Sequence, residues 1–394
     1  MKHGFLFVLL FVAQAVSAQK AINVDAEFAS AAKQYEAMLR SLPDTTRFPQ
    51  STLPDGKLRL MPSSWWCSGF FGGSLWYIFE RTGDARFREA AHRWSMAVQK
   101  EQANTRTHDL GFMLYCPLGN GYRLTKNPAY RPIMLTGAKS LATRFRPDYG
   151  VIKSWDGYKD GAGKRYEYPV IIDNMMNLEF LFWAARESGD KTLYNLCLSH
   201  ADSTMKYHYR PDMSSYHVVC YGDGGKVLAQ RTHQGAADES AWARGQAWGL
   251  YGYVVMYRET KDKKYLNFAR RIADFILKHK NLPADKIPYW DFDRPGEERD
   301  ASAGAIMASA LLELSTYGGA SKTYFKAAEQ MLQSLSSPTY KAAPGENNNF
   351  ILKHSVGHKP AKSEVDTPLI YADYYYLEAL LRYDGLRKKT ALKS

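Results

Sequence analysis

Hydrophobic residues recur every three or four positions through much of the chain, which is the period of a helix that buries one face. The stretch around Phe268, Ile272 and Ile276 has this spacing, with charged side chains between. Residues 178–185 and 250–256 are instead apolar or aromatic nearly all round. A helix of that kind is buried. The alternation of the two patterns predicts an inner ring of buried helices covered by an outer ring of amphipathic ones.

Short turns join the predicted helices in pairs. Four copies of the turn lie at residues 79–87, 187–193, 259–265 and 316–324. In each copy an apolar stretch ends at a Gly or Asp turn and an amphipathic stretch follows. Glycine favours the left-handed conformation that ends a helix, and Asp or Ser caps the next helix. The copies therefore predict helical hairpins.

Twelve helices fit this pattern and pair into six hairpins. We expect them near residues 26–41, 65–80, 84–100, 108–116, 128–143, 172–187, 190–206, 241–258, 262–279, 302–316, 320–335 and 369–383. Six hairpins in alternation predict an all-α fold, the (α/α)6 barrel or six-hairpin toroid. An open α-solenoid would share these local signals, but the unequal spacing of the hairpins argues against it.

Long loops separate several of the hairpins. They cover residues 144–171, 207–240, 280–301 and 336–368, and each precedes a helix of the buried type. We therefore expect these loops to gather at one rim, above the N-termini of the inner helices. Loops on a rigid scaffold commonly carry function, and helix N-termini favour an anionic ligand.

Composition narrows the class of protein. The chain has 394 residues, of which 14% are aromatic, too many for a disordered or fibrous protein. No stretch reads as a linker, so we expect one domain over residues 19–394. The net charge of +12 favours nucleic acid, an anionic membrane surface or an acidic polysaccharide as partner. Because Lys and Arg are spread along the chain, nucleic acid is the least favoured.

The N-terminus predicts the compartment. A charged start is followed by an apolar run at residues 5–12 and by small residues ending at Ala18. This is the pattern of a secretory signal peptide over residues 1–18, and the run is too short to span a bilayer. We expect a mature protein that starts near Gln19, has no membrane span and is secreted, most simply into the periplasm.

The cysteines and the known short motifs add little. Cys67, Cys116, Cys197 and Cys220 are widely spaced and form no CxxC pair, so we favour buried free thiols over one or two disulfides. The chain has no phosphate-binding P-loop, no GxSxG elbow and no HExxH motif. The sequence therefore predicts no metal and no cofactor.

The starts of the predicted inner helices carry Trp, Asp or Arg. Asp109, Asp173 and the Trp242–Arg244–Trp248 group are the main examples. Aromatic platforms, carboxylates and a guanidinium around one rim are what a sugar site needs. Asp109 and Asp173 stand out because each adjoins apolar residues, where desolvation raises the pKa of a carboxyl group.

Structural explanations exist for the same residues. An Asp at a helix start is most often a cap, and tryptophans can fill a core. Arg244 in an apolar setting needs an anionic partner, which can be protein or ligand. The loop segment with His217, His233 and Gln234 adds polar groups, although a lone histidine is more often structural.

Five motifs in order resemble the unsaturated glucuronyl hydrolases of glycoside hydrolase family 88. They are His-Asp-Leu-Gly-Phe at 108–112, Ile-Ile-Asp-Asn-Met-Met-Asn at 171–177, Trp-Ala-Arg-Gly-Gln-Ala-Trp-Gly at 242–249, Tyr-Trp-Asp-Phe at 289–292 and Glu-Val-Asp-Thr-Pro-Leu-Ile-Tyr-Ala-Asp-Tyr-Tyr at 364–375. The resemblance implies an (α/α)6 barrel. It also implies hydrolysis of oligosaccharides that carry a 4,5-unsaturated uronic acid at the non-reducing end, the products of polysaccharide lyases.

The resemblance implies an unusual reaction, in which the enzyme hydrates the vinyl ether of the sugar instead of displacing the glycosidic bond. One carboxyl group can then act as both acid and base, unlike the paired carboxylates of ordinary glycosidases. By resemblance Asp173 is this general acid and base, and Asp109 is a second carboxylate that assists it. Asn174 differs from the residue that family members often have after the acid.

The resemblance also implies a set of substrate-binding residues. They are Trp66, Trp155, His217, Gln234, Trp242, Arg244, Trp248, Ser355, His358 and Lys359. Arg244 suits the carboxylate of the unsaturated sugar, and the tryptophans suit stacking on sugar rings. Ser355, His358 and Lys359 lie where family members contact the sugar beside the scissile bond, and we expect them to bind a sulfate group. A solvated basic loop is the alternative.

The expected partners are acidic unsaturated oligosaccharides derived from chondroitin, hyaluronan or heparin. Two other functions are compatible with the same residues. One is the related unsaturated rhamnogalacturonyl hydrolase, which acts on pectin fragments. The other is a non-catalytic glycan-binding toroid, in which the aspartates are only caps and the tryptophans only platforms.

Overall fold

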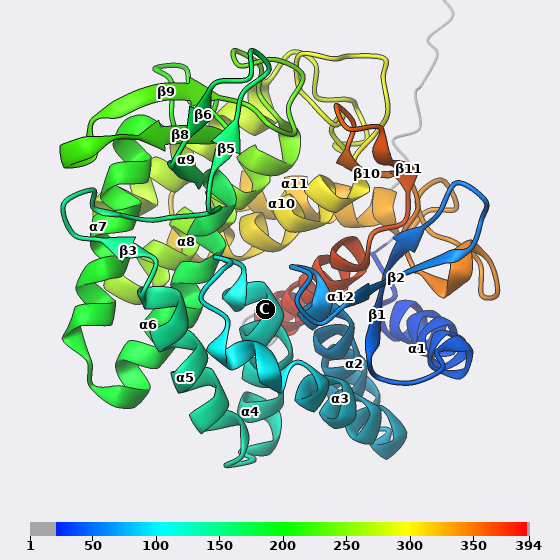
Figure 1. Cartoon of the computed structure of the whole chain (residues 1–394). Coiled ribbons are helices and arrows are strands. Elements are labelled where there is room, and N and C mark those ends of the chain that lie inside the picture. The colour runs from blue at the N-terminus through cyan, green and yellow to red at the C-terminus, as the bar shows by residue number, and fades with distance from the viewer. Residues whose placement is uncertain (1–20, 392–394) are drawn as a thin grey trace, which may run out of the picture.

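The computed structural model describes residues 21–391, and these form two concentric rings of helices (Figure 1). The inner ring contains α2 (Ser68–Thr82), η2 (Gly111–Gly119) continued by α4 (Asn120–Thr125), η3 (Ile172–Asn177) continued by α6 (Leu178–Ser188), α8 (Ala243–Thr260), α10 (Ala301–Leu314) and α12 (Ile370–Ala391). Each inner element contacts the next, and α12 packs against α2 to close the ring. Closure confirms the (α/α)6 barrel and excludes the open solenoid.

The outer ring covers the inner one. It contains α1 (Val24–Ser41), α3 (Ala85–Ala97), α5 (Tyr130–Ala142), α7 (Lys191–Tyr207), α9 (Lys263–Lys278) and α11 (Ser321–Leu335). Each outer helix buries one face, as Tyr265, Phe268 and Ile272 do in α9. Inner helices are buried nearly all round; α10 keeps only Glu313 outside the buried class. The two hydrophobic patterns of the sequence thus separate the rings as predicted.

The hairpin turns follow the predicted chemistry in full in two of four copies, and in the third Lys261, with φ of 59°, takes the place of glycine. Gly83 and Gly189 adopt the left-handed conformation, with φ of 70° and 75°. Asp84, Asp190 and Asp262 each cap the following helix by accepting from a backbone N–H. The predicted cap of the fourth copy is wrong. Its N-cap is Ala320, whose methyl side chain cannot accept a hydrogen bond. Ser321 is already the first helical residue.

One inner helix runs further than predicted. The helix expected near residues 108–116 continues past Pro117 as the π-helical segment η2 and then as α4 to Thr125. The ring of Pro117 packs against α2, where a Cβ on Gly69 would lie 2.8 Å from its Cδ. The wider π-turn therefore accommodates a proline that would break an α-helix. The last helix also extends beyond its expected end at residue 383, to Ala391.

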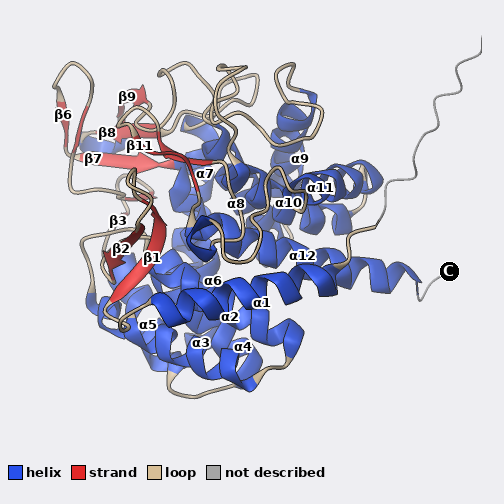
Figure 2. Cartoon of the chain, turned by 90° about the vertical axis from the view of Figure 1, so that its right-hand side faces the viewer, coloured by secondary structure: helices blue, strands red, loops and turns tan. Residues whose placement is uncertain are grey.

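The long loops contain strands that the sequence analysis did not predict. The described strands are β1 (Arg47–Thr52), β2 (Leu58–Pro62), β3 (Phe145–Arg146), β4 (Val151–Ile152), β5 (Tyr158–Lys159), β6 (Arg165–Tyr166), β7 (Tyr168–Ile171), β8 (Val218–Tyr221), β9 (Val227–Arg231), β10 (Ser355–His358) and β11 (Ser363–Thr367). They pair antiparallel, and β7, β8 and β9 form one sheet. Figure 2 shows the strands gathered at the end of the barrel where the inner helices begin. The loops therefore meet at one rim, as predicted.

Short 3-10 turns complete the connections. They are η1 (Gln99–Ala103), η4 (Asp223–Gly225), η5 (Ser315–Tyr317) and η6 (Asn347–Asn349). The four cysteines are buried free thiols, as predicted. None of the helices within residues 21–391 combines the length and the apolar character needed to cross a lipid bilayer. The predicted signal peptide, residues 1–18, lies outside the described residues.

Candidate active site

Predicted site residues from the starts of four inner elements and from two rim loops lie at the strand-covered end of the barrel. The group that we call the Asp173 cluster consists of Trp66, Asp109, Trp155, Asp173, His217 and Arg244. Asp173 stands in the first turn of η3, directly after strand β7. The backbone N–H of Ile172 donates to the carbonyl of His217 at 3.0 Å. This bond holds the η3 turn against the start of β8, so that His217 Nε2 lies 3.6 Å from Asp173 Oδ2.

Asp173 combines burial with an unsatisfied oxygen. Its side chain is 11% exposed, and Oδ2 has no hydrogen-bond partner within residues 21–391. Burial raises the pKa of Asp173 to about 7; Arg244 opposes the rise and Asp109 adds to it. A carboxyl group with this pKa is present in both protonation states near neutrality, which is what a group that gives and takes a proton requires.

His217 is neutral and its tautomer follows from its contacts. Its Nδ1 accepts from the backbone N–H groups of His233 and Gln234, both at 3.1 Å. Burial, followed by the neighbouring His233, lowers its pKa well below the ordinary value. The single ring proton must therefore sit on Nε2. His217 thus points an N–H at the free oxygen of Asp173.

Asp109 occupies the turn before η2 and has its own supporting contacts. Its Oδ2 accepts from Thr107 Oγ1 at 2.9 Å, and Oδ1 lies 3.4 Å from His108 Nε2. Burial lowers the pKa of His108, so this histidine is neutral near pH 7. Asp109 is 15% exposed and faces Asp173, where its negative charge favours the protonated form of that residue. The structure thus brings the two predicted carboxylates together.

Arg244 has a protein anion as partner, Asp300, which the sequence analysis did not pair with it. The two lie 3.3 Å apart, and both are buried. Arg244 also donates to the carbonyls of Val356 at 2.5 Å and Gly357 at 2.7 Å in β10. The Nε of Arg244 has no partner among the described residues. The guanidinium therefore ties β10 to the ring.

The four predicted stacking tryptophans divide into two pairs. Trp66 and Trp155 are partly exposed. Trp242 is 3% exposed and lies between the guanidinium of Arg244 and the ring of His217. Trp248 is fully buried, and its indole N–H faces Asp173. Stacking by Trp242 and Trp248 stays a prediction, against which the burial of both rings weighs.

The β10 segment differs from its predicted use. Ser355 Oγ is buried and has no partner among the residues described. His358 Nε2 contacts the carbonyl of His233 at 2.8 Å. Lys359 Nζ pairs with Glu297 at 2.8 Å and also contacts Glu298. Gln234 donates to the Gly357 carbonyl at 2.9 Å. Sulfate binding by Ser355, His358 and Lys359 stays a prediction, against which the ion pairs of Lys359 weigh.

An open groove of about 750 Å³ borders the cluster. Tyr158, His233 and His358 line its inner end, and the His233 ring lies 5.1 Å from Trp155. Arg231 contributes a cation further along. Within the described part of the chain, no three His, Cys, Asp or Glu side chains are placed to hold a metal ion.

A second buried aspartate shows what distinguishes Asp173. Burial also raises the pKa of Asp373 to about 7. Its oxygens, however, accept from the backbone N–H groups of Ile351 and Leu352, both at 2.9 Å, and from Tyr35 OH at 3.2 Å. Asp373 therefore fastens α12 to the loop that precedes it. The raised pKa is common to both residues, but the unsatisfied oxygen belongs to Asp173.

Comparison with known proteins places this site in a family. Residues 40–386 match the family model described as Glycosyl Hydrolase Family 88. The chain is 42% identical over 370 residues to an unsaturated glucuronyl hydrolase from Formosa agariphila, covering 92% of this chain and 91% of that protein. An unsaturated chondroitin disaccharide hydrolase from Streptococcus pyogenes is 31% identical over 347 residues, covering 85% of each.

A solved structure agrees with these relatives. It is described as an unsaturated glucuronyl hydrolase specific for heparin, and it matches with a TM-score of 0.89 at 49% identity, covering 93% of this chain and 98% of that one. The agreement in fold, length and sequence leaves one conclusion. This chain belongs to glycosyl hydrolase family 88.

Proposed function

We propose that the protein is a glycoside hydrolase that removes the 4,5-unsaturated uronic acid from the non-reducing end of lyase-generated oligosaccharides. The observation that carries the proposal is Asp173, a buried carboxyl group with a pKa of about 7 and a free oxygen at the rim. Relatives named unsaturated glucuronyl hydrolase, at 42% identity over most of the chain, support the same reaction.

In the proposed reaction, protonated Asp173 donates its proton to C4 of the unsaturated ring. Positive charge develops at C5 beside the ring oxygen, and water adds there while its proton returns to Asp173. One water is consumed and Asp173 ends as it began. The resulting hemiketal opens and releases the rest of the oligosaccharide. Between the two transfers the Nε2–H of His217, 3.6 Å away, stabilises the carboxylate.

The remaining contacts of the cluster suit an acidic sugar. We propose that Arg244 Nε and Gln234 bind the unsaturated uronate, and that Trp66 and Trp155 stack on sugar rings. The groove lined by His233 and His358 would hold the sugar on the other side of the scissile bond. Asp109 sits beside Asp173 and adds to the rise in its pKa.

The substrate class is proposed to be sulfated glycosaminoglycan, with heparin-derived disaccharides ahead of chondroitin-derived ones. The 49% identity to a hydrolase described as specific for heparin supports this order, against 31% to a chondroitin disaccharide hydrolase. The net charge of +12 is compatible with acidic saccharides. We further propose export through the signal peptide at residues 1–18 to the periplasm, where lyase products would reach the enzyme.

A substrate panel followed by ultraviolet absorbance tests the proposal, because hydration destroys the absorbing double bond. We expect absorbance to fall with heparin-derived unsaturated disaccharides, and more slowly with chondroitin- and hyaluronan-derived ones. A pectin-derived unsaturated disaccharide serves as the control. Turnover of that control alone would favour the rhamnogalacturonyl alternative, and binding without any loss of absorbance would favour a glycan-binding toroid.

A further inference from the structure

The two carboxylates of the cluster stand on turns from different inner elements, and neither turn is a regular α-helix. Asp109 precedes the π-helical η2, and Asp173 lies in the 3-10 segment η3. Hydrogen-bond geometry in a 3-10 segment is poorer than in an α-helix, and Asp109 lies before the first residue of η2. Contacts outside the turns must therefore hold the two carboxylates in register.

Two buried asparagines connect the turns. Asn177 Oδ1 accepts from the backbone N–H of Gly111 at 2.8 Å, two residues after Asp109. Asn177 Nδ2 donates to Asn174 Oδ1 at 3.2 Å, and Asn174 directly follows Asp173. Both asparagines are 0% exposed. The two amides thus form a bridge from the Asp109 turn to the Asp173 turn, which we call the asparagine bridge.

The bridge is anchored at its far end. Asn174 Nδ2 donates to the carbonyl of Ile152 at 2.7 Å and to Ser154 Oγ at 3.3 Å. Ser154 Oγ also accepts from the N–H of Ile171, the last residue of β7. The side chain of His108 interacts with Asn174 as well. Loop 144–171, the Asp173 turn and the Asp109 turn are therefore fastened at one point.

The close approach at Gly111 shows that the packing here is specific. A Cβ at this position would lie 2.6 Å from Asn177 Oδ1 and 3.1 Å from its Cα, too close for any side chain. Glycine lets the η2 backbone come near enough for the hydrogen bond to form. The bridge therefore requires a glycine on the Asp109 side and two amide side chains on the Asp173 side.

We infer that Asn174 and Asn177 are positioning residues, whose amides set the distance between the Asp109 and Asp173 carboxylates. The inference rests on the proposed function, because it assumes that Asp173 transfers the proton. Asp173 faces Asp109 from the turn before η2, His217 from the residue before β8 and Arg244 from α8. His217 is held to the Asp173 turn by its own backbone bond with Ile172, and Arg244 is held by Asp300 and β10. Asp109 is joined to the Asp173 turn through the bridge, so loosening the bridge should chiefly separate the two negative charges.

The test compares Asn177→Ala and Asn174→Ala with Asn120→Ala. Asn120 is the matched control: it is a buried amide in α4, bonded to Cys116 and Tyr374 away from the cluster. For the two bridge variants we expect kcat to fall at least about tenfold with KM changed less than about threefold. The pH at which activity is half lost should move down, because Asp173 loses the influence of Asp109. The control should lower the melting temperature and leave the pH profile in place.

The outcomes are distinguishable. If wild type turns over an unsaturated disaccharide and both bridge variants keep its kcat and pH profile, the asparagines are ordinary core contacts and the inference is overturned. Asn174→Ala keeps the bond between Asn177 and Gly111, so it reports on the bridge even where Asn177→Ala fails to fold. If wild type turns over no unsaturated disaccharide, the proposed function fails first, and the catalytic part of the inference fails with it.

Discussion

The two ends of the inner ring differ in how their buried polar groups are paired. At the end where the inner helices begin, several buried atoms lack a hydrogen-bond partner among the described residues. Those around the Asp173 cluster are Asp173 Oδ2, His217 Nε2, Arg244 Nε, Trp248 Nε1 and Tyr371 OH. A buried polar group left without a hydrogen bond costs about 1–3 kcal/mol of stability. Asp173 Oδ2 and His217 Nε2 face each other at 3.6 Å, so polar groups of this rim lie close together without a hydrogen bond.

At the end where the inner helices finish, charges are paired across neighbouring helices. Arg258 of α8 contacts Glu179 of α6 at 2.5 Å and Glu313 of α10 at 3.0 Å. Arg382 of α12 contacts the same Glu313 at 2.8 Å and Glu378 at 3.5 Å. We call these five residues the far-end network. It links four consecutive inner elements, α6, α8, α10 and α12.

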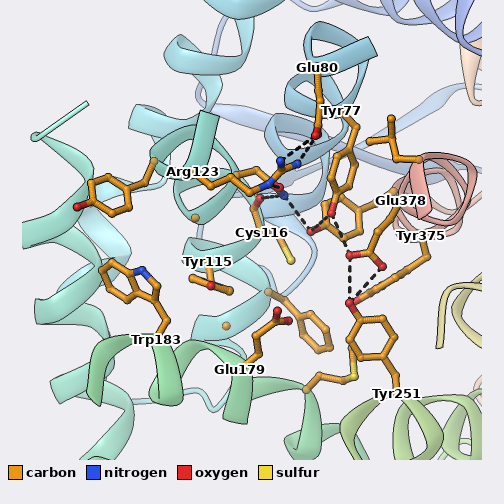
Figure 3. Close-up of a pocket in the computed structure, with 18 of the residues that line it drawn as sticks. Tyr77, Glu80, Tyr115, Cys116, Arg123, Glu179, Trp183, Tyr251, Tyr375 and Glu378 are labelled. Atoms are coloured by element: carbon orange, nitrogen blue, oxygen red, sulfur yellow. Dashed lines mark hydrogen bonds and ion pairs between the residues drawn. The ribbon is translucent and has the colours of Figure 1, made fainter. Parts of the chain in front are cut away.

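A cavity of about 550 Å³ lies beside the far-end network (Figure 3). Tyr77 and Tyr251 each donate to Glu378 at 3.0 Å, and Arg123 pairs with Glu80. The cavity is larger than many ligand sites require, yet its charged walls satisfy one another. The two regions thus differ in that the charged groups beside this cavity are paired, whereas polar groups of the Asp173 cluster are not.

We expect the largest effect from Asp173→Asn. General acid–base catalysis contributes about 10²–10⁴-fold, so we expect a loss of kcat in that range with binding retained. Burial that raises the pKa of Asp173 to about 7 also means that its ionised form destabilises the fold. Asparagine carries no such charge, so the variant should be more stable than wild type at pH 8, by roughly 2–4 kcal/mol. Ultraviolet turnover assays and urea unfolding measure the two effects.

Asp373→Asn is the matched control, since the pKa of Asp373 is also raised to about 7. Its carboxylate accepts two backbone N–H groups, and an amide can replace only one of those acceptors. We expect kcat to stay within about threefold of wild type, with a smaller gain or a loss of stability. A loss of activity equal to that of Asp173→Asn would show that a raised pKa matters without a free oxygen.

The pH dependence of kcat should follow the protonation of Asp173. Asp173 must be protonated to start the reaction, so kcat should fall about tenfold per pH unit above a midpoint near 7. The stability of the fold should also fall as pH rises. The folded pKa of Asp173 and Asp373 lies above the unfolded value, so the folded state holds more protons, and stability should decline as pH rises from about 4 to about 7. A flat kcat profile from pH 6 to 8 would remove Asp173 as the acid.

The sequence predicted features that depend on local pattern. Hydrophobic period and turn residues such as Gly83 and Asp84 suffice for the hairpins, because helix contacts lie within a few residues. The β7–β8–β9 sheet was missed because its pairs, such as Ile171 with Val218, lie far apart in the sequence. The pairing of Arg244 with Asp300 was missed for the same reason.

Burial was the second limit on what the sequence could predict. Trp66 and Trp248 are the same residue type at the starts of inner helices, yet one is partly exposed and the other fully buried. The spacing of hydrophobic residues does not distinguish an exposed tryptophan from a buried one, because both stand at apolar positions near a helix start. Asp173 and Asp373 could not be separated either, since what divides them is whether distant backbone N–H groups reach the carboxylate.

Arg258→Met tests the paired end. The substitution keeps length and apolar bulk while leaving Glu179 without its cation and Glu313 with Arg382 alone. Breaking a buried ion pair costs about 3–5 kcal/mol, and partial exposure here reduces the expected loss to about 1–3 kcal/mol. We expect a lower urea midpoint and unchanged kcat. Arg40→Met, at an exposed pair with Glu36, should cost less than about 0.5 kcal/mol. A fall in kcat at matched stability would mean that the far end takes part in catalysis.

The smallest expected effect is that of Lys359→Ala on sulfated substrates. Lys359 pairs with Glu297 and Glu298, so its positive charge is already compensated within the protein. Burial lowers the pKa of His358, which keeps that ring neutral near pH 7. We expect the ratio of kcat/KM between sulfated and unsulfated disaccharides to change less than about threefold, or about 0.6 kcal/mol.

The double variant Glu297→Gln/Glu298→Gln extends this test, because it removes both anionic partners of Lys359. If that variant gains preference for sulfate while Lys359→Ala changes little, the glutamates and not the lysine set the response to sulfate. A tenfold loss of kcat/KM for sulfated disaccharides in Lys359→Ala would instead mean that the substrate breaks these ion pairs. Lys359 would then bind the sulfate directly.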